Sequence, residues 1–214
     1  MKVALIGATG FVGSAVLAEA LQRGHEVTAI VRRIDRLPQH PKLTAKTVDI
    51  LDVDALAAAL AGHDAVIAAF NPDRTMPGDV FQRMVEGAKA IIAATKKSGV
   101  KRLLAVGGAG SLLVEAGTQL IDSPGFPPEW RAGAGGTREF LYLLKKEPDL
   151  DWTFLSPAAD LQPGERTGTF RLGGDELLVD ENGECRITTA DYAVAMIDEL
   201  EEPRHTGRRF CVAY

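Results

Sequence analysis

Residues 2–13, KVALIGATGFVG, decide the fold that the rest of the chain follows. The apolar, uncharged residues 3–6 predict a strand that is buried on both faces of a sheet. Gly7, Gly10 and Gly13 come next at three-residue spacing, and the residues after them have helical periodicity. This order of strand, glycine turn and helix predicts a site for the pyrophosphate of a dinucleotide, because a helix N-terminus offers N–H groups and a positive dipole end.

Each glycine of this turn has a predicted role. We expect Gly7 to allow the sharp turn after the strand, Gly10 to let the backbone approach a ligand, and Gly13 to let the helix pack closely on the strand. Glycine turns also occur without a ligand, so the prediction depends on the strand before the turn and the helix after it. Between the glycines lie three further candidates for contact with the cofactor: Thr9, Phe11 and Val12.

The motif GATGFVG in residues 7–13 resembles that of the atypical branch of the short-chain dehydrogenase/reductase superfamily. Its spacing is G-x-x-G-x-x-G, one residue longer than the usual dinucleotide fingerprint. The branch includes the NmrA-like proteins, the biliverdin reductase B type and a group of NAD(P)H-flavin reductases. The resemblance covers nearly the whole chain, and it implies a Rossmann-type fold and a nicotinamide cofactor.

The composition fits one globular domain. The chain has 214 residues, of which 46% are hydrophobic and 25% charged. We expect a single NAD(P)-binding Rossmann domain over residues 1–214, to which residues 157–188 contribute a small substrate lobe. The net charge of −5 argues against a nucleic-acid partner, and no run approaches the roughly 18 apolar residues of a membrane span. Cys185 and Cys211 lack metal or redox spacing, so we expect a cytoplasmic protein without a metal site.

Strands and helices alternate along the chain. Apolar runs predict strands at residues 26–31, 43–48, 64–70, 102–106, 152–156 and 209–213. Alternation of this kind predicts an α/β fold, in which a doubly wound parallel sheet is covered by helices on both faces. We therefore expect the ligand at the carboxyl ends of the strands, where the strand order reverses.

The end of the second predicted strand indicates which dinucleotide binds. Arg32 and Arg33 follow the glycines by about 20 residues, where an NAD site places an acidic residue on the ribose 2′-hydroxyl. A carboxylate would repel a 2′-phosphate, whereas two arginines would attract it. The sequence thus favours NADP, with NAD as the alternative. A second interpretation is that Arg32, Arg33 and Arg36 form a solvated basic turn.

The family resemblance implies further contacts with the cofactor. In the family an acidic and an apolar residue after the third strand hold the adenine, and Asp49 and Ile50 match them. Asp52 suits a different role, the cap of the helix that follows. The remaining matches, along the ribose and at the nicotinamide end, are Ala68, Ala69, Phe70, Gly107, Ser156, Pro157 and Ala158.

Ser111 is the candidate catalytic residue, because superfamily members place a Ser or Thr just after the fifth strand. Its hydroxyl would bond a substrate carbonyl, and the alternative is a local backbone bond in a glycine-rich turn. Most of the superfamily also uses a Tyr-x-x-x-Lys pair for proton transfer. Tyr142 and Lys146 have this spacing, but they come too late on their helix to reach the cofactor. The family pair belongs near residues 132–136, where this chain has only Ala and Gly.

Residues 113–133 lack a sustained period and hold three prolines, which predicts a loop that covers a ligand. Phe126 and Trp130 are candidates for stacking a planar substrate, or alternatively for packing the loop on the surface. We expect a helix over residues 135–147 and a hairpin formed by residues 170–172 and 177–179.

A complete cofactor edge beside an incomplete acid–base set favours an NAD(P)H-dependent reductase. It would pass hydride directly to FMN, another flavin or a related planar acceptor, which needs no protein acid at the reacting centre. One alternative is a non-catalytic NmrA-like dinucleotide sensor that binds a protein partner. The other is a sugar-nucleotide epimerase or dehydratase. A homodimer is also left open.

Overall fold

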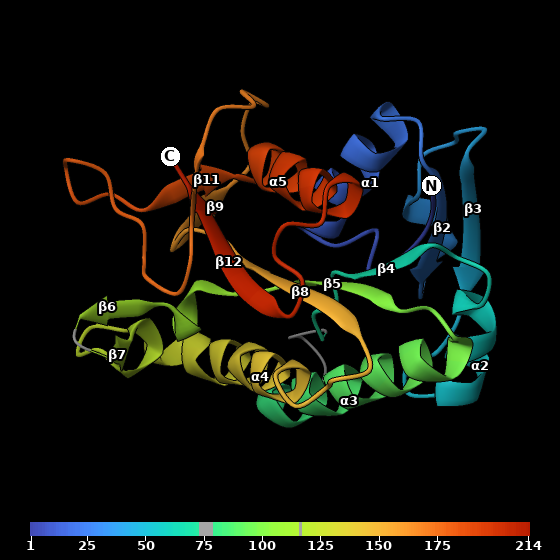
Figure 1. Ribbon diagram of the computed structural model, residues 1–214, viewed down its shortest axis with the longest axis horizontal. Helices are drawn as coiled ribbons and strands as arrows, with labels where there is room; N and C mark the ends of the chain where they lie inside the picture. Colours follow the sequence, from blue (N-terminus) through green and yellow to red (C-terminus); the bar gives the residue numbers. More distant parts are fainter. Residues whose placement is uncertain (73–78, 116) are drawn as a thin grey trace.

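The computed structural model describes residues 1–72, 79–115 and 117–214 (Figure 1). Its main strands are β1 (Lys2–Ile6), β2 (Glu26–Val31), β3 (Leu43–Thr47), β4 (Ala65–Ala68), β5 (Arg102–Val106), β8 (Asp151–Ser156) and β12 (Arg208–Ala213). The α-helices are α1 (Gly13–Gln22), α2 (Val53–Leu60), α3 (Val80–Ser98), α4 (Pro128–Leu144) and α5 (Thr189–Glu201). Shorter strands are β6 (Leu113–Glu115), β7 (Thr118–Gln119), β9 (Asp160–Gln162), β10 (Arg171–Gly173) and β11 (Arg186–Thr188).

The described residues form an eight-stranded sheet in the order β10-β12-β8-β5-β4-β1-β2-β3. Neighbouring strands are parallel except for β10, which runs antiparallel to β12 at one edge. The chain leaves β1 toward β2 and β3 on one side, and it continues with β4 and β5 on the other. The strand order therefore reverses between β1 and β4, and the predicted Rossmann-type α/β fold is confirmed.

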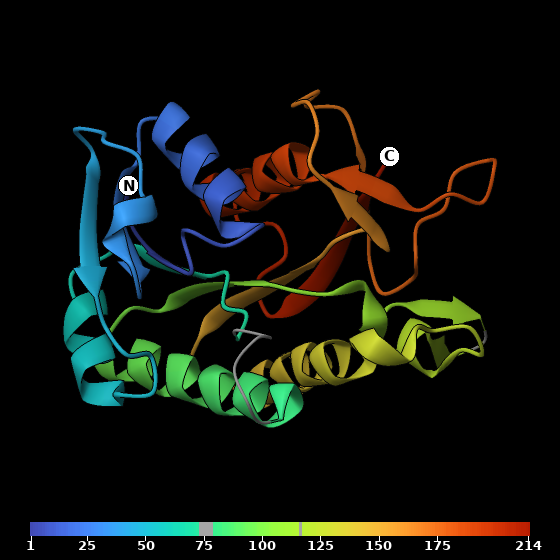
Figure 2. The same cartoon turned by 180° about the vertical axis from the view of Figure 1, so that it is seen from behind.

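Helices cover both faces of this sheet (Figure 2). Helices α1 and α5 lie on one face, and α2, α3 and α4 lie on the other (Figures 1 and 2). Successive residues of β1 belong to different cores, since Val3 packs with the α1 and α5 side and Ala4 with the opposite side. This burial on two faces is the reason for the uncharged apolar run at residues 3–6.

Helix α4 begins earlier than the sequence predicted, at Pro128 instead of residue 135. Pro128 occupies the first helical turn, where the fixed φ of proline suits a helix and its missing N–H is not needed. The first turn carries no apolar stripe because it is solvent-exposed, and Trp130 in it is 52% exposed. The predicted loop over residues 113–133 is therefore shorter, and it contains the small β6–β7 pair.

The predicted hairpin of residues 170–172 and 177–179 is wrong. Strand β10 pairs instead with β12, where Arg171 lies opposite Ala213 and Gly173 opposite Cys211. The local turn at Gly173 predicted that this strand would pair within a hairpin. It pairs instead with the edge of β12. Assignment of residues 157–188 as a substrate lobe stays a prediction.

Within the described ranges, no helix has the length and apolarity that crossing a bilayer requires.

Candidate functional site

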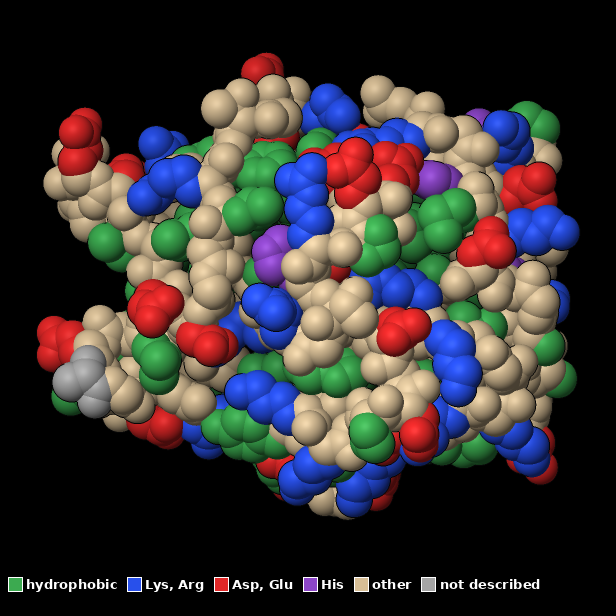
Figure 3. Space-filling view, in the orientation of Figure 1, with side chains coloured by type: hydrophobic (Ala, Val, Ile, Leu, Met, Phe, Trp, Pro, Cys, Tyr) green, Lys and Arg blue, Asp and Glu red, His purple; other side chains and the backbone are tan. Residues whose placement is uncertain are grey.

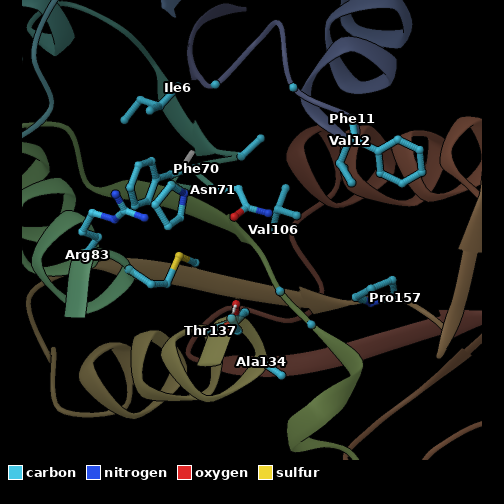
Figure 4. Close-up of a pocket in the computed structure, with 18 of the residues that line it drawn as sticks. Ile6, Phe11, Val12, Phe70, Asn71, Arg83, Val106, Ala134, Thr137 and Pro157 are labelled. Carbon is cyan, nitrogen blue, oxygen red and sulfur yellow. Dashed lines mark hydrogen bonds between the residues drawn. The ribbon is translucent and has the colours of Figure 1, made fainter. Parts of the chain in front are cut away.

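A cavity of about 1230 Å³ lies along the carboxyl ends of the central strands (Figure 4). A typical small-molecule pocket has roughly 300–1,000 Å³, so this one has room for a dinucleotide and a second molecule. Its walls come from the glycine loop after β1, the segments that follow β2, β3, β4, β5 and β8, and one face of α4. The cavity therefore lies where the strand order reverses.

The glycine loop has the geometry of a cradle. Gly7 has a φ of +80°, and a Cβ there would lie 2.4 Å from the carbonyl oxygen of Ala69. A Cβ at Gly13 would lie 2.0 Å from the carbonyl oxygen of Gly7, so Gly13 serves close packing and does not line the cavity. Gly10 does line it, together with Thr9, Phe11 and Val12.

The N-terminus of α1 follows this loop and carries no side-chain cap at Val12. By contrast Asp52, Asp79 and Thr188 cap α2, α3 and α5, and the cap predicted at Asp52 is confirmed. An uncapped helix N-terminus beside a glycine cradle suits an anionic group such as a diphosphate. These residues therefore fit the phosphates of a dinucleotide.

Among the described residues that line the cavity, the charged ones belong to the segments after β2 and β3 and to α3, and we call this set the charged end. Its members are Arg32, Arg33 and Arg36 after β2, Asp49 after β3, and Arg83 and Glu86 on α3. Arg33 contacts Asp35 at 3.5 Å, and both side chains are more than 60% exposed. An exposed ion pair of this kind contributes little, so its exchange for a ligand phosphate is easy. Ile50 and Leu51 complete the wall beyond β3.

Residues after β4 line the centre of the cavity. Ala69, Phe70 and Asn71 reach it, whereas Ala68 is buried inside the sheet and does not. The Phe70 ring packs on α3, since a Cβ at Gly87 would lie 2.2 Å from it. Figure 4 shows the Arg83 side chain extending toward Phe70 and Asn71.

Sequence reasoning missed Arg83 and Glu86. They lie on α3 beside Met84, whose apolar stripe predicted only core packing. Met84 is buried, as expected, but it also borders the cavity. One sequence signal could have found them. They are charged residues next to the apolar stripe of a helix, and this helix follows a strand that was predicted to contact the cofactor.

The opposite part of the cavity, the neutral end, has a different lining. It consists of residues 107–110, Leu120, Ser123, residues 125–127, four residues of α4 and residues 157–159 with Leu161. The α4 residues share one face: Trp130, Gly133, Ala134 and Thr137. Among the described residues that line this end, none is titratable. Thr137 supplies a hydroxyl, which donates to the carbonyl oxygen of Gly133 at 2.9 Å.

Three residues predicted at the nicotinamide end, Gly107, Pro157 and Ala158, line the neutral end. Gly107 is also required for packing, because a Cβ there would lie 2.3 Å from the ring of Phe154. Ser156 is different. Its side chain is fully buried behind the wall and does not border the cavity.

Ser111 requires a correction. Its side chain is only 2% exposed and does not line the cavity, so it does not meet a substrate in this structure. Its hydroxyl instead accepts a hydrogen bond from Arg209 at 3.4 Å, and the Nε of Arg209 donates to Asp175 at 2.6 Å. Neither the predicted substrate contact nor the local backbone bond describes this arrangement. A contact between residues 98 positions apart holds Ser111 inward.

The rejection of Tyr142 and Lys146 as an acid–base pair agrees with their positions. The Tyr142 hydroxyl accepts a hydrogen bond from the side-chain amide of Gln119 at 3.0 Å, and neither residue lines the cavity. One helical turn of α4 that does face the cavity, from Gly133 to Thr137, lacks a phenol or an amine. Within the part of the chain that the structure describes, the neutral end therefore offers no Tyr and Lys pair for proton transfer.

Phe126 and Trp130 both border the neutral end. Phe126 is half-buried, and the guanidinium of Arg131 lies 5.7 Å from the centre of its ring. Trp130 stands on the first turn of α4, not on a loop as predicted. A rigid helix thus carries one of the two aromatic rings that can stack a planar molecule.

Asp191, at the start of α5, fixes the segment that follows the neutral end. It is fully buried and accepts hydrogen bonds from the backbone N–H groups of Thr167 and Gly168, and from the hydroxyls of Thr167 and Tyr214. Burial raises the pKa of Asp191, but these bonds outweigh it and lower the pKa below its usual value. The ionised carboxylate therefore holds residues 167–168 and the end of β12 together.

Known proteins resemble the whole of this chain. The sequence profile of a family described as NAD(P)H-binding matches residues 7–203. The uncharacterized protein YwnB of Bacillus subtilis is 42% identical over 218 residues, covering 99% of this chain and 98% of that protein. A crystal structure of a "putative epimerase" from Bacteroides thetaiotaomicron is 46% identical, with a TM-score of 0.94 over 100% of this chain and 96% of that chain. A "putative NADH-flavin reductase" from Streptococcus pneumoniae is 36% identical, with a TM-score of 0.87 over 100% and 99% of the two chains.

Proposed function

The chain belongs to the NAD(P)H-binding family, and we propose that it is an NADPH-dependent reductase of a flavin or a related planar acceptor. The family match confirms the predicted likeness to the atypical short-chain dehydrogenases/reductases. The NAD(P)H-binding family supports an NAD(P)-dependent oxidoreductase. We propose in addition that this protein prefers NADPH and reduces a flavin-like acceptor.

One observation carries the proposal: the charged end fits a dinucleotide, while the described lining of the neutral end holds no titratable group. Reduction of a carbonyl or epimerisation of a sugar needs a protein acid or base at the reacting carbon. An electron-poor ring accepts hydride directly, so positioning by the protein is sufficient. The neutral end therefore suits a ring acceptor better than a sugar nucleotide.

Each part of the chain has a separate task in this mechanism. The glycine loop and the N-terminus of α1 hold the diphosphate, and Arg32 and Arg33 hold a 2′-phosphate. Phe126 and Trp130 stack the acceptor and exclude water from one of its faces. Bound NADPH supplies a hydride; the acceptor takes it with one proton from water, and the products are the reduced acceptor and NADP⁺.

The alternative with some support is a dinucleotide sensor without turnover. The same lack of an acid–base pair at the neutral end favours it, because a sensor needs none. Its distinguishing property is tight NADP(H) binding without oxidation by any acceptor.

Anaerobic NADPH oxidation, measured with riboflavin, FMN, quinones and aldehydes, tests the proposal. We expect turnover with flavins or quinones and none with aldehydes, because an aldehyde requires a proton donor at its oxygen. Tight NADPH binding without turnover of any acceptor would replace the reductase by the sensor. Turnover of aldehydes alone would contradict the proposed mechanism.

A further inference from the structure

The cavity divides its charges unequally between its two ends. Four arginines and two acidic residues line the charged end, whereas the described lining of the neutral end carries no charged side chain. Its members are Gly, Ala, Pro, Leu, Phe and Trp, with Ser123 and Thr137 as the hydroxyl groups. The charged end therefore suits a dinucleotide with several phosphates, and the neutral end suits an uncharged molecule.

The sequence around the two ends has the same asymmetry. Residues 1–111 hold 14 Lys or Arg and ten Asp or Glu, a net charge of +4. Residues 112–188, which include most of the neutral end and also the start of β8 at the far edge of the sheet, hold seven Lys or Arg and 14 Asp or Glu, a net charge of −7. Figure 3 shows acidic side chains at the tips of both projections on the left, over β6–β7 and over the loop before β11. An anionic group that approaches this side meets a repulsive field.

Arginines close to the neutral end are held by acceptors within the protein. Arg131 lies over the Phe126 ring and donates to the carbonyl oxygen of Ile121 at 3.0 Å. Arg138 donates to Asp122 at 2.8 Å, and the Nε of Arg209 donates to Asp175 at 2.6 Å. None of the three lines the cavity. Recruiting one of them for a ligand phosphate would break an existing contact.

We propose that the acceptor is an uncharged planar ring, a riboflavin-type flavin without phosphate or a quinone, and that phosphorylated flavins are poor substrates. The proposal rests on the reductase function and names its substrate class. Trp130 and Phe126 cover one face of the acceptor ring, and its other face stays open to the bound nicotinamide. In the reaction riboflavin, NADPH and a proton give dihydroriboflavin and NADP⁺, so hydride and proton are both accounted for.

Riboflavin and FMN form a matched pair, because they share one ring and differ in a single phosphate. We expect kcat/KM for riboflavin to exceed that for FMN by about tenfold or more, since a phosphate dianion would enter a neutral wall in an acidic field. Equal values, or a preference for FMN, would overturn the proposal. The quinone arm compares 1,4-naphthoquinone with its 2-sulfonate, after subtraction of the uncatalysed rate. Whichever of riboflavin and naphthoquinone has the higher kcat/KM shows whether the acceptor is a flavin or a quinone.

Binding provides a readout that is independent of turnover. With NADP⁺ present, quenching of flavin fluorescence should give a lower Kd for riboflavin than for FMN. If riboflavin binds with a lower Kd than FMN but is not reduced, the reductase function fails and the preference for an uncharged ring stands. If neither flavin nor quinone binds, both proposals fail.

A positive charge introduced at the neutral end should shift the preference toward the phosphorylated flavin. Ala159 lines the cavity with an exposed side chain, and only its backbone N–H, which donates to the Cys185 sulfur at 3.2 Å, is engaged. Ala159→Lys should lower the preference for riboflavin over FMN by about tenfold, while Ala159→Met, of similar length, should keep it. Equal ratios in the two variants would contradict the electrostatic origin of the preference.

Discussion

The charged end and the neutral end of the cavity are built in different ways. The charged end comes from loops that leave parallel strands directly, as Gly7 leaves β1, Arg32 leaves β2 and Asp49 follows β3. The neutral end depends on contacts between distant segments. Leu113 exchanges backbone hydrogen bonds with the segment of residues 175–177, and Arg209 holds Asp175 and Ser111. The proposed dinucleotide site is therefore encoded locally, whereas the wall of the neutral end is encoded by long-range packing.

Gly10→Val is the strongest test of the local encoding. A branched side chain would fill the space beside the glycine loop, and we expect NADPH affinity to fall by roughly 100-fold, about 3 kcal/mol. A Cβ at Gly10 meets only the Gly7 oxygen, at 3.2 Å, so the thermal midpoint should change little. Calorimetric titration and a melting curve measure both quantities. Unchanged affinity in a folded variant would exclude this loop as the phosphate site.

Removal of both Arg32 and Arg33 sharpens the comparison, since it takes two positive side chains from the charged end and leaves the neutral end intact. Charge-assisted hydrogen bonds contribute about 1.5–3 kcal/mol each, so Ala at both positions should weaken NADPH binding at least about tenfold. NADH binding should hardly change. In the wild type the preference for NADPH should shrink as salt rises, because ions screen exposed charges. An equal loss for NADH would assign the arginines to another role.

Asp191→Asn tests the long-range encoding. The pKa of Asp191 is lowered in the folded protein, so its stabilisation is present at neutral pH and is lost as pH falls below about 4. Asn would point its NH₂ group at donors, and we expect a loss of about 1–3 kcal/mol in unfolding free energy at pH 7. Urea unfolding at pH 7 and pH 3.5 should show the gap between variant and wild type closing in acid. A gap independent of pH would exclude the ionised carboxylate as its origin.

Trp130→Ala is expected to have the smallest effect. It should raise the acceptor KM several-fold, with a smaller change in kcat, because stacking of about 0.5–1.5 kcal/mol is lost mainly from the bound ground state. Tyr142→Phe is the matched control on the same helix, and its turnover should stay within a factor of about two. Loss of a true general acid costs about 10²–10⁴-fold. A loss of that size in Tyr142→Phe would contradict the direct transfer of hydride.

The sequence predicted the sheet and the cavity-lining residues after β1, β2 and β3, because their signals are local. An apolar run, a glycine turn and a helical stripe follow one another within residues 2–22, and strand ends place Arg32 and Asp49 at one edge. Ser111 shows the limit of such reasoning. Its position after β5 matched the expectation, but Arg209, far along the chain, decides where its hydroxyl points.

The neutral end was harder to predict for the same physical reason. Trp130 lies on an exposed first turn of α4, where no apolar stripe indicates a helix. The Gly173-Gly174 turn predicted a hairpin, but the pairing energy of β10 is gained with β12, 40 positions later. The hairpin error thus concerns a contact between distant segments, whereas the early start of α4 has no apolar signal in the local sequence.

The place of β12 in the sheet has a consequence for synthesis on the ribosome. β12 lies between β8 and β10, although its residues are made after both. More than 50 residues separate the end of β8 from the end of β12, and at about 5–20 residues per second their addition takes on the order of 3–11 s. During this interval the nascent chain holds β8 as an open edge with unpaired backbone groups. Shielding by a chaperone is therefore most useful to this protein in the interval between the synthesis of β8 and the synthesis of β12.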